Sequence, residues 1–185
     1  MYLFKSKFLK DIRLVCLISF ILIIYSCGSE PTTNSKELKY FDVKGYFSKE
    51  IARLSKLNKP VLKSINFNGK NEVKRLFINN WENEFDFFSS SDINKPSWKD
   101  SYTIEASENL LIYRAKDVNL KLQEMIVKQV NNKVKWIMIY NNTKNMLYES
   151  SEKLSYFPDS LYLIQKSQKV RLLKKNYYII KGSFK

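Results

Sequence analysis

The stretch 133–140 reads KVKWIMIY and carries the clearest strand signal in the chain. Trp136 and Met138 fall on one face of an extended backbone, because side chains alternate along a strand. Ile137 and Ile139 fall on the other face. A strand that is apolar on both faces is typical of the interior of a sheet. We therefore predict a central strand over 133–141.

Similar runs rich in Ile, Val, Leu and Tyr fill the chain from residue 102 onward. The predicted strands cover 102–106, 110–116, 119–130, 133–141, 145–156, 161–173 and 176–184. Short polar turns such as Asn131-Asn132 and Pro158-Asp159 separate them. Because short connections join antiparallel neighbours, this pattern predicts an antiparallel meander.

Two amphipathic helices are predicted before the meander. Val43, Phe47 and Leu54 recur at helical spacing, which predicts a helix over 42–57 with Asp42 as its N-cap.

The second helix is predicted over 80–91, where Trp81, Phe85 and Phe88 are spaced i, i+4 and i+7. Between the two helices, the pair Asn68-Gly69 is a strong hairpin signal.

A two-residue loop at Asn68-Gly69 sets Ile65 opposite Glu72. The predicted fold class is therefore α+β. Two N-terminal amphipathic helices, with a hairpin between them, pack on a twisted antiparallel β-meander.

The composition excludes most named catalytic chemistries. The 185 residues include no histidine, so the chain has no Ser-His-Asp triad, no Cys-His dyad and no His-containing zinc site. Its four glycines form no phosphate-binding loop. We therefore expect no catalytic residues, no metal and no cofactor, and we expect that the protein is not an enzyme.

The first 27 residues have the layout of an export signal. Lys5, Lys7, Lys10 and Arg13 form a basic start, and residues 14–25 read LVCLISFILIIY without a charge. A membrane-spanning helix needs about 20 apolar residues, so this shorter run is typical of a signal-peptide core.

The segment Ile24-Tyr25-Ser26-Cys27 resembles the lipobox of bacterial lipoproteins. Ile24, Ser26 and Cys27 match its aliphatic, small and cysteine positions. The resemblance covers residues 1–27 only. It implies cleavage between Ser26 and Cys27 and a diacylglycerol thioether on Cys27. A third acyl chain such as palmitate usually follows on the new amine. Two or more chains anchor a protein stably to a membrane.

The resemblance also implies a location and a domain plan. In enterobacterial lipoproteins an aspartate after the cysteine retains the protein in the inner membrane. Gly28 stands there instead and favours the outer membrane. We expect a removed signal peptide over 1–26, an acylated cysteine and polar tether over 27–36, and one folded domain over 37–185.

The net charge of +14 raises the question of a polyanionic partner. Only five of the 32 basic residues are arginine, whereas nucleic-acid-binding proteins favour arginine, so we expect no nucleic acid.

Lys, Asn, Ile, Tyr and Phe are also the residues of AT-rich codons, so part of the positive charge is explained by nucleotide composition. We expect contact with the membrane through acylated Cys27, and an envelope protein or an anionic lipid or glycan as partner. A basic patch concentrated over 166–185 would favour anionic head groups.

Four short clusters remain as candidates for chemistry. They are Glu82-Glu84-Asp86, Ser150-Ser151-Lys153, Asp92-Ile93-Asn94 and the sequon Asn141-Asn142-Thr143. We interpret the acidic cluster as a solvated helix face. The serine cluster lacks an S-x-x-K motif, and the third lacks the glycine and glutamate of a calcium loop.

Three functions fit the sequence. The first is a lipid-anchored, non-enzymatic binding or accessory module of the cell envelope. The second is a protein that binds a lipid or hydrophobic ligand in a cleft of several hundred Å³ between helices and sheet. The third is a glycan hydrolase with two carboxylates roughly 5 to 9.5 Å apart.

Overall fold

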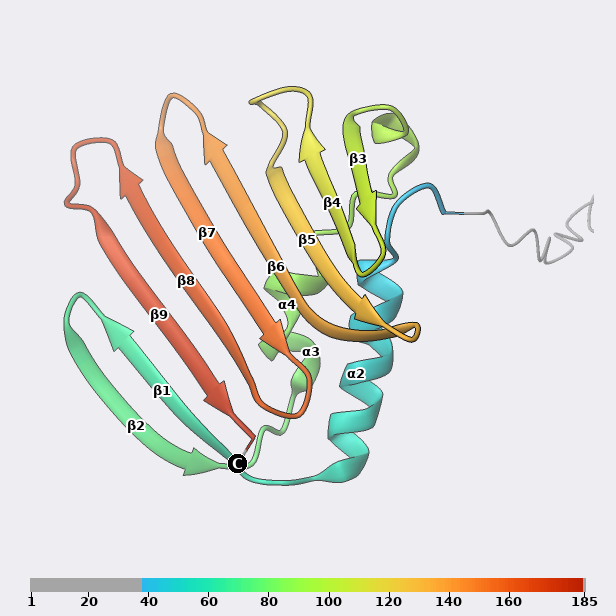
Figure 1. The fold of residues 1–185 in the computed structure, drawn as a ribbon. Coiled ribbons are helices and arrows are strands. Elements are labelled where there is room, and N and C mark those ends of the chain that lie inside the picture. The colour runs from blue at the N-terminus through green and yellow to red at the C-terminus, as the bar shows by residue number, and fades with distance from the viewer. Residues whose placement is uncertain (1–37, 185) are drawn as a thin grey trace, which may run out of the picture. The chain divides into compact units, whose positions relative to one another are not determined.

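A nine-stranded antiparallel sheet dominates residues 38–184, the part of the chain that the computed structural model describes (Figure 1). Its strands are β1 (Val61–Phe67), β2 (Lys70–Leu76), β3 (Tyr102–Ser107), β4 (Leu110–Ala115), β5 (Leu122–Val130), β6 (Lys133–Lys144), β7 (Tyr148–Phe157), β8 (Leu161–Val170) and β9 (Asn176–Ser183). Their order across the sheet is β2-β1-β9-β8-β7-β6-β5-β4-β3. Strands β3 to β9 therefore form a meander in chain order.

Polar residues at the turns set where the meander reverses. Asn131 and Asn132 adopt φ of 52° and 58°, a left-handed conformation that asparagine tolerates better than most residues. The strand predicted over 133–141 is β6, which lies between β5 and β7 inside the sheet. Ile137 and Ile139 are buried on one face of β6, while Met138 is partly exposed on the other.

The hairpin predicted at Asn68-Gly69 is confirmed, and Ile65 lies opposite Glu72 as expected. Asn68 and Gly69 both have positive φ, which a tight two-residue hairpin turn requires. The hairpin does not pack on the meander. Strand β1 pairs instead with β9, so β1 and β2 extend the sheet by two strands.

The helix predicted over 42–57 is confirmed as α2 (Val43–Leu57). The Asp42 carboxylate accepts a hydrogen bond from the Gly45 N–H at 2.8 Å and so caps the helix start. Asn58 ends the helix in the left-handed conformation, and its N–H donates to the Leu54 carbonyl.

The predicted fold class, with two N-terminal amphipathic helices, is wrong. Of the helices in residues 38–184, only α2 has seven residues or more. Residues 80–91 instead form two four-residue helices. These are α3 (Trp81–Glu84) and α4 (Asp86–Ser89), and the 3₁₀ helix η1 (Pro96–Trp98) follows. Phe85 breaks the helix with φ of −102° and ψ of 11°. The break places Trp81, Phe85 and Phe88 all in the core, so the spacing predicted burial but not continuity.

The core lies between the helices and one face of the sheet (Figure 1). The Phe47 ring of α2 is 5.4 Å from Phe85, 4.8 Å from Phe88 and 5.1 Å from Tyr156, centroid to centroid. Phe85 also meets Tyr162 edge to face at 5.4 Å. Such aromatic pairs contribute about 0.5–1.5 kcal/mol each beyond the area that they bury.

Two glutamates satisfy the hydroxyls of the core tyrosines. Tyr156 and Tyr162 face each other across β7 and β8, and each donates its phenol proton to a carboxylate. Glu50 accepts from Tyr156, and Glu84 accepts from Tyr162. Both phenols would otherwise be buried without a partner, which costs about 1–3 kcal/mol each.

The expected signal peptide, the acylated Cys27 and the tether fall on residues 1–36, outside the described residues. Within residues 38–184, no helix is long and apolar enough to cross a membrane.

Gly182 makes room for the Tyr162 ring. The two residues pair across β8 and β9. A Cβ on Gly182 would lie 2.0 Å from a carbon of that ring, far inside van der Waals contact. The ring cannot move easily, because its hydroxyl is held by Glu84.

We predict that Gly182→Ala lowers the free energy of unfolding by about 1–3 kcal/mol, the usual cost of overpacking a core. The urea midpoint of unfolding measures this effect. Ser183→Ala, one residue along the same strand, is the matched control and should change stability by less than about 0.5 kcal/mol. Equal midpoints for Gly182→Ala and the parent protein would contradict the packing described.

Candidate functional site

The sheet face opposite the helices is the candidate functional surface, and we call it the open face. None of the helices in residues 38–184 lies over it (Figure 1). Directly opposed residues of antiparallel strands share a face, so the register defines this surface. Its central side chains are Ile112, Arg114, Glu124, Ile126, Lys128, Met138, Tyr140, Lys153, Ser155, Leu163, Gln165, Ile179 and Lys181.

A depression of about 450 Å³ lies at the centre of the open face. Ile126 and Met138, opposed across β5 and β6, form its apolar floor. Tyr140 and Lys153, opposed across β6 and β7, supply a hydroxyl and an ammonium group at its rim. The depression can therefore bury apolar atoms while it offers hydrogen bonds to their polar neighbours.

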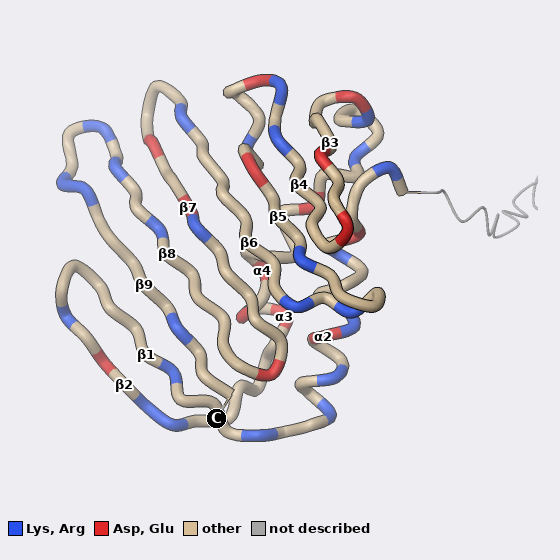
Figure 2. The backbone as a smooth tube through the Cα atoms, in the orientation of Figure 1, with Lys and Arg blue, Asp and Glu red and all other residues tan. Residues whose placement is uncertain are grey.

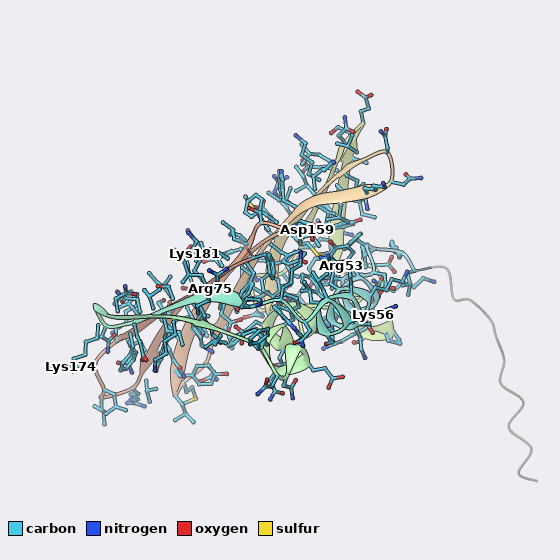
Figure 3. The ribbon with its side chains drawn as sticks, turned by 90° about the horizontal axis from the view of Figure 1, so that it is seen from below. Arg53, Lys56, Arg75, Asp159, Lys174 and Lys181 are labelled. Carbon is cyan, nitrogen blue, oxygen red and sulfur yellow. The ribbon has the colours of Figure 1, made fainter. Side chains whose placement is uncertain are left out.

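The open face carries basic side chains without an acidic partner. Arg114 bonds both Glu105 and Glu124, the latter at 2.8 Å, so these acids are neutralised within the face. Lys153 and Lys181 form no ion pair with any residue of the described chain. Figure 2 shows the basic residues along these strands, and Figure 3 shows Lys181 on the side away from the helices. The surface thus suits a partner with acidic groups around apolar ones.

A buried polar cluster lies on the helix-bearing face beside α4. The Glu152 carboxylate is 3.1 Å from the Lys166 ammonium, and it accepts a hydrogen bond from the Asn141 amide at 3.3 Å. The same amide donates to the Ser91 hydroxyl at 3.0 Å. The Ser150 hydroxyl, also buried, has no hydrogen-bond partner among the described residues. The cluster joins the end of α4 to the sheet. Its only carboxylate, Glu152, is already paired with Lys166.

Two carboxylates converge on Arg53 where α2 meets the β7–β8 turn (Figure 3). The guanidinium lies 2.7 Å from Glu50 and 2.8 Å from Asp159. The hydrogen bond to Glu50 is the main cause that raises the pKa of Arg53. An arginine between two carboxylates neutralises both, so this arrangement is an ion-pair link. It does not resemble the acid–base pair that a glycan hydrolase needs.

The acidic cluster Glu82-Glu84-Asp86 is split by the fold. Glu82 and Asp86 are exposed, as expected for a solvated helix face. Glu84 points into the protein, where it accepts from Tyr162 and lies 2.6 Å from the Lys63 ammonium. The three carboxylates therefore form no common site.

The serine cluster is also divided, because its residues alternate between the two faces of β7. Ser150 lies on the helix-bearing face, while Ser151 and Lys153 lie on the open face. The Ser151 hydroxyl is 2.8 Å from that of Ser167 on β8. No serine–lysine pair with a hydrogen bond is found in this part of the described chain.

The remaining two candidates have structural roles. Asp92 accepts the Asn94 N–H at 3.0 Å, and the Asn94 amide donates to the carbonyls of Tyr40 and Phe41. This tie fixes the chain before α2. Asn141 of the sequon is 1% exposed and cannot accept a sugar in the folded protein.

The space between helices and sheet is filled by the aromatic core. A hollow at its edge, lined in part by Leu54, Val61 and Trp81, measures about 110 Å³. Ligand pockets usually hold about 300–1,000 Å³. A second, open hollow of about 530 Å³ lies where α2 meets the β5–β6 and β7–β8 turns, and its lining includes Tyr46, Lys49 and Val134. Any ligand cleft between helices and sheet would therefore lie at this edge, because the centre of the interface is filled.

The open-face residues were not identified from the sequence. The signal was present in the stretch 136–140, which is apolar on both faces. Helices cover only one of those faces, so the second apolar face needs another explanation. In the structure, Met138 and Tyr140 lie on this second face and are partly exposed.

No group of His, Cys, Asp and Glu within the described range is arranged to hold a metal ion. Comparison of the chain with protein-family models, curated proteins and solved structures found no match to any of them. The function must therefore be argued from the surface itself.

We predict that stability falls steeply at alkaline pH. Burial, together with the neighbouring carboxylates, raises the pKa of Tyr156 and Tyr162, and burial raises the pKa of Tyr102 to about 12. Unfolded tyrosines ionise near pH 10, so above that pH the unfolded state binds fewer protons and gains stability. The contribution is complete below about pH 10 and is lost as the pH rises through the folded-state values.

Urea unfolding at about pH 9 and about pH 11, with tyrosinate absorbance as the second readout, measures this loss. Tyr156→Phe should reduce the drop between the two conditions. Tyr177→Phe, at an exposed position, is the matched control and should leave the drop unchanged. An identical drop in both variants would show that ionisation of Tyr156 does not contribute to the loss.

Proposed function

We propose that this chain is a lipid-anchored, non-enzymatic protein of the bacterial cell envelope that binds a partner protein on the open face of its sheet. The observation that carries the proposal is the open face itself. It combines an apolar depression of about 450 Å³ with the unpaired bases Lys153 and Lys181, and none of the described helices covers it. Apolar surface in a folded protein is normally buried, so a contiguous exposed patch indicates an interaction site.

The size of the face fits a protein partner. Nine strands spaced about 4.8 Å apart, with roughly eight residues each, give an area on the order of 1,000 Å². A standard protein interface buries about 800 Å² on each partner. Unpaired Lys153 and Lys181 favour a partner that carries acidic groups around an apolar centre, because complementary charge steers association.

The anchor in this proposal comes from residues 1–27. The basic start, the twelve-residue apolar core and Ile24-Tyr25-Ser26-Cys27 together support lipid attachment at Cys27. The charged and apolar surfaces of the domain would then act at a membrane without a catalytic step. The carboxylates of Glu50 and Asp159, which lie close together, are both paired with Arg53.

We predict that the protein extracted from membranes in mild detergent begins at Cys27 and carries two or three acyl chains. An intact-mass measurement detects both features. Cys27→Ala should abolish acylation and leave the signal segment attached. Cys16→Ala is the matched control and should be processed like the parent chain, because that segment is removed. A full-length, unmodified parent chain would rule out the anchor.

We predict that a photo-cross-linking amino acid at position 138 captures one envelope protein in the producing cells. The same amino acid at Ile104, which is 44% exposed compared with 38% for Met138 but lies on the helix-bearing face, should not capture it. Mass spectrometry of the adducts identifies the captured species. The double variant Lys153→Glu with Lys181→Glu should reduce the adduct by at least roughly tenfold, because like charges oppose an acidic partner.

Lys56→Glu with Lys59→Glu changes the net charge equally at a distant site and serves as the control. Adducts of equal yield at positions 138 and 104 would exclude the open face as the binding surface. A lipid or small hydrophobic molecule found on position 138 would instead favour the ligand-binding alternative.

A further inference from the structure

Three loops hold the five most exposed large hydrophobic side chains of residues 38–184. These are Leu172 at 98%, Met146 at 85%, Val118 at 81%, Leu147 at 69% and Leu173 at 64% exposed. They lie in the loops 116–121, 145–147 and 171–175, which connect β4 to β5, β6 to β7 and β8 to β9. We call these loops together the loop end of the sheet.

The meander places all three loops at the same end of the sheet (Figure 1). The loops are also tied to their neighbours by backbone hydrogen bonds. The Arg171 N–H donates to the Leu147 carbonyl at 2.8 Å, so the second and third loops lie side by side. At the other end, the turns 108–109, 131–132 and 158–160 contain no large hydrophobic side chain except the ring of Pro158. The two ends of one meander therefore differ in chemistry.

Folding does not require these aliphatic residues. Leu172 adopts φ of 68°, a left-handed conformation that costs a bulky residue energy, and its side chain is almost fully in solvent. Glycine or asparagine would serve such a turn better. A strained, exposed leucine is a reason to look for a function.

Basic residues surround the exposed aliphatic ones. The loop end carries Lys116, Lys121, Arg171, Lys174 and Lys175, and the adjoining strand ends carry Lys144 and Lys169. The acids of these loops and strand ends are Asp117 and Glu149, and Asp100 lies at the same end in an ion pair with Lys39. Figure 2 shows basic residues in the β8–β9 loop and at the adjoining strand ends. Lysine and arginine beside exposed aliphatic side chains are the combination that binds anionic lipid surfaces.

The start of the described chain lies at this same end. Lys39 is 2.6 Å from Asp100, just before β3, and the Lys116 N–H donates to the Ser101 carbonyl at 2.9 Å. Ten residues lie between Cys27 and Leu38, and the eleven Cα–Cα steps from one to the other can span at most about 36–40 Å. Six strand spacings, from β3 to β9, measure about 29 Å. An anchor at Cys27 is therefore short enough to keep the whole loop end near a bilayer.

We infer that the loop end docks on an anionic bilayer, with Leu172, Leu173, Met146 and Leu147 inserted among the lipids and the basic side chains at the head groups. The geometric part of this inference rests on the proposed anchor, whereas the exposure and the charge stand without it. Exposed aliphatic side chains favour acyl chains over a glycan, which would offer them no apolar surface. Docking would hold the open face upright from the membrane, accessible to a partner from the side.

The test uses the acylated protein reconstituted in vesicles of phosphatidylcholine, with or without phosphatidylglycerol. Leu172→Cys carries an environment-sensitive fluorophore, and a nitroxide on the lipids quenches it at the membrane. Glu108→Cys, in an exposed turn at the opposite end, is the matched control. We expect quenching at position 172 in vesicles that contain phosphatidylglycerol, and none at position 108.

Two further variants separate charge at the loop end from overall charge. In the Leu172→Cys chain, Lys174→Glu with Lys175→Glu should lower the ratio of docked to undocked loops by at least roughly 25-fold, because each base near an anionic surface contributes about fivefold. Lys56→Glu with Lys59→Glu should leave that ratio unchanged. Circular dichroism confirms that each variant keeps its sheet.

Equal quenching at positions 172 and 108, or quenching at 172 that does not depend on phosphatidylglycerol, would overturn the inference. Vesicle flotation separates this result from a failure of the anchor, because an unacylated chain would not stay with neutral vesicles. If the chain is not acylated, the same labelled chain is titrated from solution with phosphatidylglycerol vesicles. A spectral shift at position 172 alone would then support docking without the anchor, and no shift would overturn it.

Discussion

The packing of Phe47 against Tyr156, and of Phe85 against Tyr162, is the interaction on which the other features depend. The rings give the sheet an apolar face, but each tyrosine also brings a hydroxyl into the core. A buried hydroxyl needs a partner, and the helices supply Glu50 and Glu84. A largely buried carboxylate in turn needs a cation, which Arg53 and Lys63 provide. Each requirement follows from the one before, so the aromatic core determines the position of the ion pairs around it.

This core, with the helices that pack on it, covers only one face of the sheet. The longest described helix, α2, has 15 residues, and α3 and α4 have four each. Together they cover the middle of one face, and no described helix lies over the other. The residues that pack the core and those that face outward therefore alternate along the same strands. Ile137 and Ile139 stabilise the fold, while Met138 between them is free to contact a partner. One strand can thus serve stability and recognition at the same time.

Local signals predicted the local structure. Asn68-Gly69 fixed a turn because both residues tolerate positive φ, and Asp42 with Asn58 bounded α2. The pairing of β1 with β9 joins residues more than a hundred positions apart and leaves no local trace, so the hairpin was placed wrongly. The break at Phe85 was missed for a related reason. Helical spacing reports which side chains are buried, but three buried aromatic residues can also be presented by two short helices. The open face was missed because exposure depends on what covers a strand.

The turns at the two ends of the sheet differ in how well their residues suit the backbone conformation. A turn between antiparallel strands needs residues that tolerate its backbone geometry, and Asn131, Asn132 and Asp159 meet that need at one end. Leu172 occupies the same backbone region at the other end, where its side chain gains no burial within the described residues. Neither turn geometry nor packing within the described residues favours leucine there, so a contact outside the chain would have to offset the cost of its backbone strain and exposure. A lipid surface would bury the side chain, and the bases nearby would bind its head groups. The same residue that weakens the isolated domain would then strengthen the anchored one.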